Sequence, residues 1–427
     1  MTSTRAQPST DTIAQSQSAE VAHNRRITLA LFAAGLTTFA SMYNAQALLP
    51  SLSEAFGATP ARAALAVSLT TGCLALAIVP VSALSSRVGR TKVMIGSAVA
   101  AAVIGLLLPF SPSLDLLLAG RALQGIALAG VPAVAMAYLA EEIGTEGLGA
   151  AMGVYVAGTT IGGLAGRLIP SFTLDVASWR WAAAAVGVAV AAGTVWFVQL
   201  LPPSRGFVAR PAGLRTVLGD LGTQLRHRQL LALFGLAFVL MGGFVSVYNF
   251  LGYRLTQRPF ELPAAVAGSV FLLYLAGTVA SAWGGRLADR VGRHRMLTAS
   301  MALMGVGLAL SLPDRLGCVA VGVLLYTAGF FAAHTVASAW VGTLARGNRG
   351  AASSLYLFFY YLGSAVVGGL SGLAFAHAGW LGLTATVAAL LAVGAILFAV
   401  AMIRSRNGIQ SSGGSPVESR PMAKLRR

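Results

Sequence analysis

Long apolar segments alternate with short polar connections along most of the chain. Each apolar segment has about 17 to 29 residues, and about 20 residues suffice for an α-helix to cross the hydrocarbon core of a membrane. The pattern therefore predicts an all-α membrane protein with twelve transmembrane helices. Their expected positions are residues 27–49, 62–84, 93–110, 114–139, 148–170, 180–201, 229–252, 263–285, 296–312, 316–344, 351–375 and 379–403.

Three polar segments flank or divide these runs. Residues 1–24 are rich in Ser, Thr and Gln and lack apolar periodicity, which indicates a disordered N-terminal tail. Residues 202–228 begin with two prolines and hold five arginines, and we interpret them as a cytoplasmic linker. Residues 404–427 form a basic C-terminal tail. The linker separates an N-terminal bundle, residues 25–201, from a C-terminal bundle, residues 229–403, with six helices in each.

The composition excludes a water-soluble fold, and the distribution of Arg and Lys predicts the orientation of the chain in the membrane. Of 427 residues, 56% are hydrophobic and 10% are charged, whereas about a quarter of a soluble domain is charged. The net charge of +17 does not indicate a nucleic-acid partner, because Arg and Lys lie in short clusters between the apolar runs. Cytoplasmic termini would put 23 of the 30 Arg and Lys on the inner side. The positive-inside rule therefore predicts a multi-pass protein of the cytoplasmic (inner) membrane with both termini in the cytoplasm.

Short motifs recur in the same order in the two halves. Residues 87–90, Arg-Val-Gly-Arg, recur at residues 290–293, and Tyr43-Asn44 recurs as Tyr248-Asn249. The glycine-rich residues 162–166 recur at residues 368–372. The three spacings are 203, 205 and 206 residues, which indicates duplication of a six-helix unit and hence two pseudo-symmetric bundles.

These motifs carry a resemblance to a known family. Gly285-Arg-Leu-Ala-Asp289-Arg290-Val-Gly292-Arg293-His-Arg295 matches the pattern Gly-x-Leu-x-Asp-Arg-x-Gly-Arg-x-Arg. The fourth span carries Arg121-Ala-Leu-Gln124-Gly125, similar to Arg-x-x-Gln-Gly, and the fifth carries residues 158–163, similar to an exporter motif with Thr159 in place of its proline. The chain thus resembles the major facilitator superfamily, most closely its twelve-span drug-efflux-type branch and the YnfM-like transporters. The resemblance implies transport by alternating access, with efflux as the expected direction.

The matched loops are expected to act as conformational gates. In the family the loop aspartate latches its half to the other half, and we expect Asp289 to meet residues 147–150 when that gate is closed. In the first-half copy Ser86 replaces the aspartate, which predicts a weaker latch. The alternative is a loop that only anchors the chain by its positive charge. The expected gate residues are Ser86, Arg87, Gly89, Arg90, Gly285, Asp289, Arg290, Gly292 and Arg293.

Glycines on the fifth and eleventh spans recur every four residues. Such spacing puts small residues on one helix face, where a neighbouring backbone can approach closely. The pattern suits static packing and a sliding hinge equally. The residues concerned are Gly158, Gly162, Gly163, Gly166, Gly368 and Gly372.

Polar and aromatic residues within the spans indicate a substrate pathway. A charge within the hydrocarbon is costly unless it reaches the interface or faces a polar cavity, and we favour the cavity for Arg121. His334 lies near the middle of its span, where a structural and a functional role are equally plausible, and a tyrosine could instead be an interfacial anchor. The expected pathway residues are Tyr43, Asn44, Gln46, Arg121, Gln124, Tyr248, Asn249, His334, Tyr356 and Tyr360.

The titratable residues narrow the chemistry. All 13 acidic residues fall in tails, loops or span ends, so a neutral or anionic small molecule is the expected substrate, and His334 is the fallback carrier of a coupling proton. No catalytic, metal-binding or cofactor motif is present, which argues against an enzyme. The alternatives to an efflux transporter are an uptake permease and a non-transporting membrane sensor. A duplicated unit can enclose a pathway by itself, so a monomer is expected to function.

Overall fold

The computed structural model describes residues 10–143, 145–207, 214–345 and 348–412, and every regular element within them is a helix. Ten helical stretches are long and apolar enough to cross a membrane. One of them, Arg349–Val400, contains two helices that meet at non-helical Ala378 and Gly379. A further helix, Arg293–Leu310, occupies the place of the ninth predicted span. The prediction of twelve helices is therefore confirmed.

The N-terminal half contains six spans, two of which are broken. The first span breaks at Asn44 and the fourth at Ala129. The elements of this half are α1 (Thr10–Tyr43), α2 (Ala45–Phe56), α3 (Pro60–Val88), α4 (Arg90–Leu107), η1 (Leu108–Phe110), α5 (Leu114–Leu128), α6 (Gly130–Glu142), α7 (Thr145–Leu174) and α8 (Trp179–Leu200).

The C-terminal half repeats this plan after a short connecting helix. The eighth span consists of three consecutive helical segments, and the last two spans share one long element. The elements from the connecting helix onward are α9 (Leu214–Leu225), α10 (Arg228–Thr256), α11 (Ala264–Gly268), η2 (Ser269–Leu273), α12 (Tyr274–Val291), α13 (Arg293–Leu310), α14 (Leu316–Leu344) and α15 (Arg349–Ser412).

The two gate loops share one backbone turn. Gly89 ends α3 and begins α4 with a φ of 108°, and Gly292 ends α12 and begins α13 with a φ of 92°. Residues other than glycine rarely adopt such φ angles. The repeated Arg-Val-Gly-Arg sequence thus marks a tight reversal between consecutive spans that only glycine forms without strain.

The segments outside the bundles differ from the sequence-based expectation. Residues 10–24 continue the first span as helix α1, where a disordered tail was expected, and residues 1–9 lie outside the described part. The linker contains helix α9, and α15 extends past residue 403 to Ser412. Residues 413–427 of the predicted basic tail lie outside the described part. Polar composition hid the extensions of α1 and α15. Helix α9 carries an apolar stripe at helical spacing, which includes Leu214, Leu218, Leu221 and Leu225, but the stripe is too short to read as a span.

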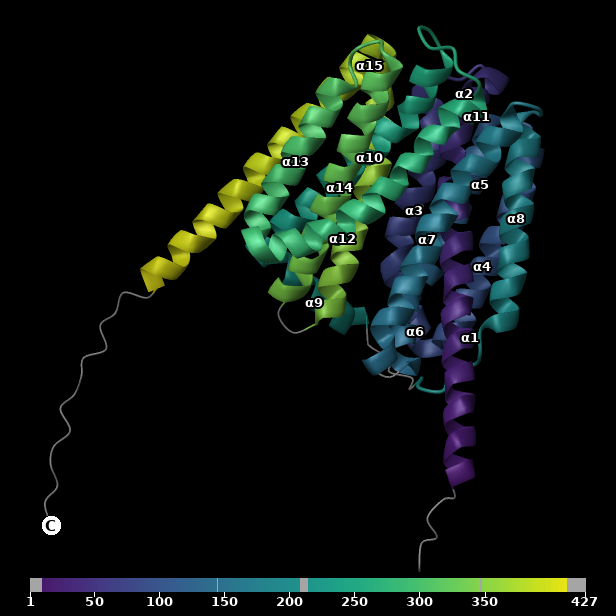
Figure 1. Ribbon diagram of the computed structural model, residues 1–427, viewed down its shortest axis with the longest axis vertical. Helices are drawn as coiled ribbons and strands as arrows, with labels where there is room; N and C mark the ends of the chain where they lie inside the picture. Colours follow the sequence, from purple (N-terminus) through teal and green to yellow (C-terminus); the bar gives the residue numbers. More distant parts are fainter. Residues whose placement is uncertain (1–9, 144, 208–213, 346–347, 413–427) are drawn as a thin grey trace, which may run out of the picture.

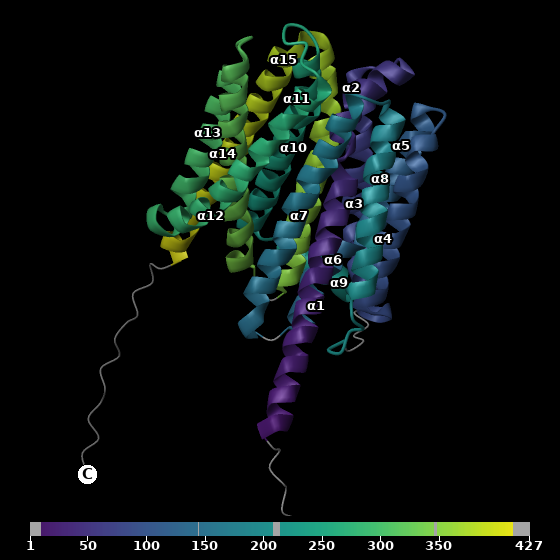
Figure 2. The ribbon, with the colours of Figure 1, turned by 45° about the vertical axis from the view of Figure 1, so that its right-hand side comes forward.

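The two halves lie side by side and meet along one seam (Figure 1). Following Figure 1, we call the end that carries α2 and α11 the upper end, and the end that carries α9 the lower end. Asp175 lies at the upper end because it contacts α11. Arg90 and Asp289 lie at the lower end, because α3 and α12 run from the upper end down to them. Across the seam α3 packs along α15, α7 meets α11 and η2, and α2 meets α10. Figures 1 and 2 show α12 and α13 leaning away from α6 toward the lower end.

Hydrogen bonds across the seam are confined to one part of its height. They range from a bond between Ser53 and Tyr253 near the upper end to one between Thr71 and Ser364 near the middle of α3. Among the residues that the structure describes, no hydrogen bond or ion pair joins the two bundles at the lower end. The seam is therefore closed above and parted below.

The repeated glycines of α7 pack against the backbone of α1. A Cβ added at Gly158, Gly162 or Gly166 would overlap the carbonyl oxygens of Phe32, Leu36 and Ala40, respectively, which are themselves four residues apart on α1. Both helices belong to the N-terminal half, so this contact holds the bundle together. By contrast, a Cβ at Gly372 of α15 would overlap the backbone of Ala61 on α3, across the seam.

We expect Gly162→Ala to lower the thermal stability of the protein, because the new methyl group must push α7 away from α1. Overpacking of this kind costs about 1–3 kcal/mol, or roughly 2–5 °C in melting temperature. The matched control is Gly153→Ala on the same helix, where an added Cβ meets nothing within 4 Å. Thermal unfolding of the two purified variants in one detergent checks this, and equal melting temperatures would contradict the packing role.

Candidate functional site

Arg121 is enclosed inside the N-terminal half. Its side chain is 1% exposed, and its guanidinium donates to five oxygens from α1, α3, α5 and the α1–α2 break. The acceptors are the carbonyl oxygens of Ser41, Met42 and Ala66 and the side-chain oxygens of Asn44 and Gln124, at 2.6–3.1 Å. The expectation of a cavity-facing arginine is therefore not met in this conformation.

The local fold explains why Arg121 is needed there. The helix break at Asn44 leaves the carbonyls of Ser41 and Met42 without their usual partners four residues on, and buried carbonyls must find a donor. Arg121 supplies it. Gln124, one turn further along α5, also donates to the carbonyl oxygen of Ala101 on α4 at 3.0 Å. Arg121 and Gln124 thus fix the first span to three other helices.

A second buried arginine, Arg167 on α7, lies at the seam and was missed from the sequence. It is 2% exposed. Its Nε donates to Gln46 Oε1 at 2.7 Å, and one terminal nitrogen donates to the hydroxyl of Tyr274, in the other half, at 3.2 Å. Its guanidinium also lies 4.4 Å from the ring centre of Tyr43 and 4.6 Å from that of Tyr274. An arginine inside a predicted span, next to Gly166, was the available signal.

Four predicted pathway residues of the first and seventh spans, Tyr43, Gln46, Tyr248 and Asn249, lie around Arg167. Gln46 Nε2 donates to Asn249 Oδ1 at 2.8 Å, which links the two halves directly. Tyr43 lies under Arg167, while the Tyr248 hydroxyl bonds to Thr327 at 2.7 Å and its ring packs on Tyr274. Both tyrosines of the repeated Tyr-Asn motif and Asn249 thus lie at the centre of the seam, whereas Asn44 accepts from Arg121 inside the N-terminal half.

His334, Tyr356 and Tyr360 form a second group within the C-terminal half. The Tyr356 hydroxyl lies 3.0 Å from His334 Nδ1, and the rings of His334 and Tyr360 are 4.8 Å apart. The ring of Phe330 stacks on that of His334, with centres 5.9 Å apart. His334 and Tyr360 are partly exposed while Tyr356 is buried. The structure therefore brings these three predicted residues together on α14 and α15.

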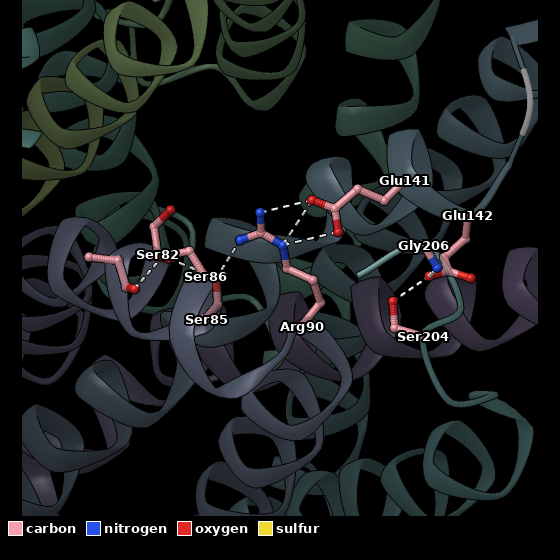
Figure 3. A network of polar contacts seen from close by, with 9 residues as sticks. Ser82, Ser85, Ser86, Arg90, Glu141, Glu142, Ser204 and Gly206 are labelled. Atoms are coloured by element: carbon pink, nitrogen blue, oxygen red, sulfur yellow. Dashed lines mark hydrogen bonds and ion pairs between the residues drawn. The ribbon is translucent and has the colours of Figure 1, made fainter. Parts of the chain in front are cut away.

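Polar contacts at the lower end hold each half together, and Figure 3 shows those of the N-terminal half. Arg90 at the start of α4 pairs with Glu141 at the end of α6 at 2.9 Å and donates to Ser85 Oγ at 2.7 Å. The equivalent Arg293 donates to Thr343 at the end of α14 at 2.7 Å. Ser86 donates back to the Ala83 carbonyl of its own helix. These contacts brace the gate loops without crossing the seam.

Three other predicted gate residues are exposed to solvent at the parted lower end. Asp289 is exposed and makes no hydrogen bond or ion pair within the described residues, and Arg87 and Arg290 are also exposed. Gly285 lies beside Thr335 of α14. The expected contact of Asp289 with residues 147–150 is absent from this conformation, and it stays a prediction for a conformation in which the lower end is closed.

The loop after α8 is fastened to the N-terminal half near these residues. The carboxylate of Glu142 accepts hydrogen bonds from the Ser204 hydroxyl and from the backbone N–H groups of Arg205 and Gly206, the latter at 2.9 Å. Figure 3 shows Glu142 beside Ser204 and Gly206. The start of the linker therefore moves with the N-terminal half.

At the upper end an aspartate closes the seam. Both carboxylate oxygens of Asp175, just after α7, lie 3.2 and 3.3 Å from the backbone nitrogen of Ala265, which donates to them from the first turn of α11. A carboxylate is favoured at a helix start by unpaired N–H groups and the helix dipole. The Tyr253 hydroxyl adds bonds to Ser53 and to the Leu49 carbonyl across the seam. Sequence reasoning missed Asp175 because nothing local marks its partner.

The site offers polar recognition rather than catalytic or metal chemistry. Within the described residues no group of three His, Cys, Asp or Glu side chains could hold a metal ion. The charged residues buried there are Arg121 and Arg167. A polar, aromatic seam between two helical bundles suits the binding of a small molecule.

Comparison with known proteins gives consistent matches over nearly the whole chain. The sequence profile of the Major Facilitator Superfamily matches residues 31–273 and 250–427. The chain is 39% identical to the uncharacterized MFS-type transporter YybF of Bacillus subtilis (strain 168), over 86% of this chain and 91% of that protein. It is 40% identical to the inner membrane transport protein YnfM of Escherichia coli (strain K12), over 86% and 88%. A crystal structure of a mutant of the nucleoside transporter NupG superposes with a TM-score of 0.74 at 12% identity, covering 89% of this chain and 99% of that chain.

Proposed function

Since the chain belongs to the major facilitator superfamily, we propose that it is a secondary transporter that moves a small organic solute across the cytoplasmic membrane by alternating access. One observation carries the proposal: the seam between the halves is bonded from its middle to the upper end and parted at the lower end. A one-sided closure is what a carrier shows when its site faces one side of the membrane. The seam lies within one chain, which supports a functional monomer.

The lower end faces the cytoplasm in this proposal. The connections at that end carry most of the Arg and Lys, including the clusters around Arg90 and Arg293, and the positive-inside rule favours the cytoplasmic side for such loops. The start of α1 and the end of α15 also lie toward that end (Figure 1). The conformation is then open to the cytoplasm, and both termini are cytoplasmic.

Export is the direction that we propose. Residues 158–163 of α7 resemble the exporter motif of the family, with Thr159 in place of its proline. The motif glycines Gly158 and Gly162 pack α7 onto α1, so this motif shapes the helix that also carries Arg167. Uptake and a sensing role without transport are the alternatives, and they give different results in the experiment below.

The substrate that we propose is neutral or anionic. No Asp or Glu is buried among the described residues, whereas Arg121 and Arg167 are. A cationic solute would therefore find no carboxylate inside the bundle to neutralise it. If a proton drives the transport, His334 is the titratable group best placed to carry it, because it lies partly exposed within the C-terminal half.

Transport by the purified protein in liposomes tests the class, direction and coupling together. The liposomes are loaded with or bathed in pairs of small carboxylic acids and their amides, with and without an imposed pH gradient. We expect flux of at least one solute above protein-free liposomes, faster toward the side that corresponds to the cell exterior. Faster flux toward the interior would indicate uptake, and the absence of flux for every solute would support a sensor and overturn the proposal.

A further inference from the structure

Arg167 carries a buried positive charge at membrane depth. It lies seven residues before the end of α7, or about 10 Å below the upper helix end at 1.5 Å per residue. Charged side chains at such depth are rare and typically face a pathway or a partner. Its contacts with Gln46 in one half and Tyr274 in the other place it on the seam itself.

No carboxylate neutralises this charge. The ion pairs within the described residues involve other arginines, and every oxygen that accepts from Arg167 is uncharged: Gln46 Oε1, the Gly163 carbonyl and the Tyr274 hydroxyl. A guanidinium has five N–H donors, so two N–H groups of Arg167 have no acceptor among the residues that the structure describes. Arg121, by contrast, meets five oxygens within one half. All five acceptors of Arg121 lie within the N-terminal half, three of them at one terminal nitrogen, so Arg121 is a structural group of that half. Arg167 has three acceptors and lies on the seam.

A second donor without a partner among the described residues lies in the hydrogen-bond chain that runs from Arg167 through Gln46 to Asn249. Gln46 accepts from Arg167 and donates to Asn249, and Asn249 is completely buried. The Nδ2 of Asn249 has no hydrogen-bond partner within the described part of the chain. Buried polar groups without partners are uncommon and costly. The seam therefore has unused donors at Arg167 and Asn249, and a ligand that fits it must supply acceptor oxygens.

Aromatic rings define the rest of the ligand. The Arg167 guanidinium lies over Tyr43, Tyr274 and Phe271, with ring centres 4.4–5.4 Å away. Stacked rings offset only part of the charge, by about 0.5–2 kcal/mol for each pair. Phe331 and Phe244 continue the aromatic surface beyond Tyr274, at 5.9 and 5.4 Å. Phe244 and Phe271 are buried, whereas the rings of Tyr274 and Phe331 are partly exposed and suit a flat, apolar body attached to the anionic group.

We propose that Arg167 is the anion-recognition residue of the transport site and that the substrate is an organic anion, a carboxylate on a flat apolar body. The inference rests on the proposed transport function and narrows its neutral-or-anionic substrate to an anion. The carboxylate oxygens accept from the unused donors of Arg167, in the bidentate geometry that a guanidinium favours. Because Arg167 bonds to Tyr274 across the seam, the anion competes with a contact that joins the halves.

Thermal unfolding with matched acid and amide probes tests this assignment. The probes are benzoate and benzamide, 4-hydroxybenzoate and 4-hydroxybenzamide, and salicylate and salicylamide, each at about 10 mM with the purified full-length protein. We expect at least one acid to raise the melting temperature of the wild type by roughly 2 °C more than its amide. Arg167→Gln should remove that difference, and Arg167→Lys should retain part of it.

The control variant is Arg180→Gln. The Arg180 guanidinium also lies over an aromatic ring, that of Trp179, and bonds to the Ser111 carbonyl, but it lies away from the seam. The acid-specific shift should be unchanged in this variant. If Arg167→Gln does not fold, Tyr274→Phe, which frees one more donor of Arg167 in the unliganded protein, should keep or enlarge the shift.

The outcomes separate this inference from the transport function. An acid-specific shift of equal size in wild type and Arg167→Gln, or no acid-specific shift in any pair, would overturn the assignment. If the thermal-shift result overturns the anion assignment but amide flux in liposomes persists in Arg167→Gln, the transport function still holds. An acid-specific shift that depends on Arg167, in a protein that moves no solute, would instead refute transport and retain the binding site.

Discussion

Replacing Arg121 by Met is expected to reduce the yield of folded protein at least about fivefold. Methionine fills similar space but donates no hydrogen bond, so five buried oxygens lose their donor. An unpaired buried polar group costs about 1–3 kcal/mol, and folded proteins are stable by only about 5–15 kcal/mol. The first span would no longer be held at its break at Asn44, and the α1–α2 connection should unravel.

The measurement is the amount of monodisperse protein after extraction, by fluorescence-detected size-exclusion chromatography. Arg62→Met is the control, because Arg62 forms an ion pair with Asp115 in which both side chains are more than half exposed. Pairs of that kind contribute at most about 1 kcal/mol, so this variant should behave like the wild type. A normal yield and melting temperature for Arg121→Met would show that the Arg121 contacts are dispensable.

Asp175→Asn and Asp289→Asn are expected to slow transport about tenfold while shifting the conformational equilibrium in opposite directions. Each aspartate lies at the C-terminal end of one of two antiparallel spans, α7 and α11–α12. Asp175 reaches the start of α11 in this structure, and Asp289 is predicted to reach the start of α7 in the other conformation. A charged hydrogen bond at a helix start contributes about 1.5–3 kcal/mol, and about 1.4 kcal/mol changes a population tenfold.

Ser86→Ala is the matched control for Asp289→Asn, because Ser86 takes the equivalent place in the first-half loop and bonds only to its own helix. Its transport rate should stay within about twofold of the wild type. Rates are measured as initial flux in liposomes that contain equal amounts of each variant. If Asp289→Asn slows transport no more than Ser86→Ala does, the lower latch is refuted and the loop is an anchor only.

The fold was largely predictable because lipid imposes a simple rule on the sequence. Twelve apolar runs and a repeat with nearly one spacing gave the twelve helices and the two halves, and both are confirmed. The glycines Gly89 and Gly292 were also recognisable, since their positive φ angles leave little choice of residue. Residues 10–24 were not recognised as helix, because a polar helix at the end of a span carries no comparable signal. Helix α9 was missed although its leucines recur at helical spacing, because the linker was judged by its prolines and arginines.

The site was predictable only in part, because its geometry depends on contacts between distant segments. The sequence pointed to Tyr43, Gln46 and Asn249, which the structure brings together at the seam. Arg167 and Asp175 were missed, since a single charge beside a glycine face or in a loop does not reveal its partner across the molecule. The helix break at Asn44, which explains Arg121, left no pattern that distinguishes it from a continuous span.

The most direct test of the two-state account is a pair of distance measurements by double electron–electron resonance, on protein in nanodiscs with Cys73 and Cys318 replaced by Ala. One pair of spin labels, at Ala150 and Leu287, spans the lower end, and the other, at Val176 and Leu316, spans the upper end; all four residues are exposed.

We expect Asp175→Asn to populate a shorter lower distance and a longer upper distance, and Asp289→Asn to favour the reverse. In each variant the upper distance should lengthen when the lower distance shortens, and shorten when the lower distance lengthens. A single distance at each pair, identical in the wild type and both variants, would contradict the claim that the two halves rock about the seam.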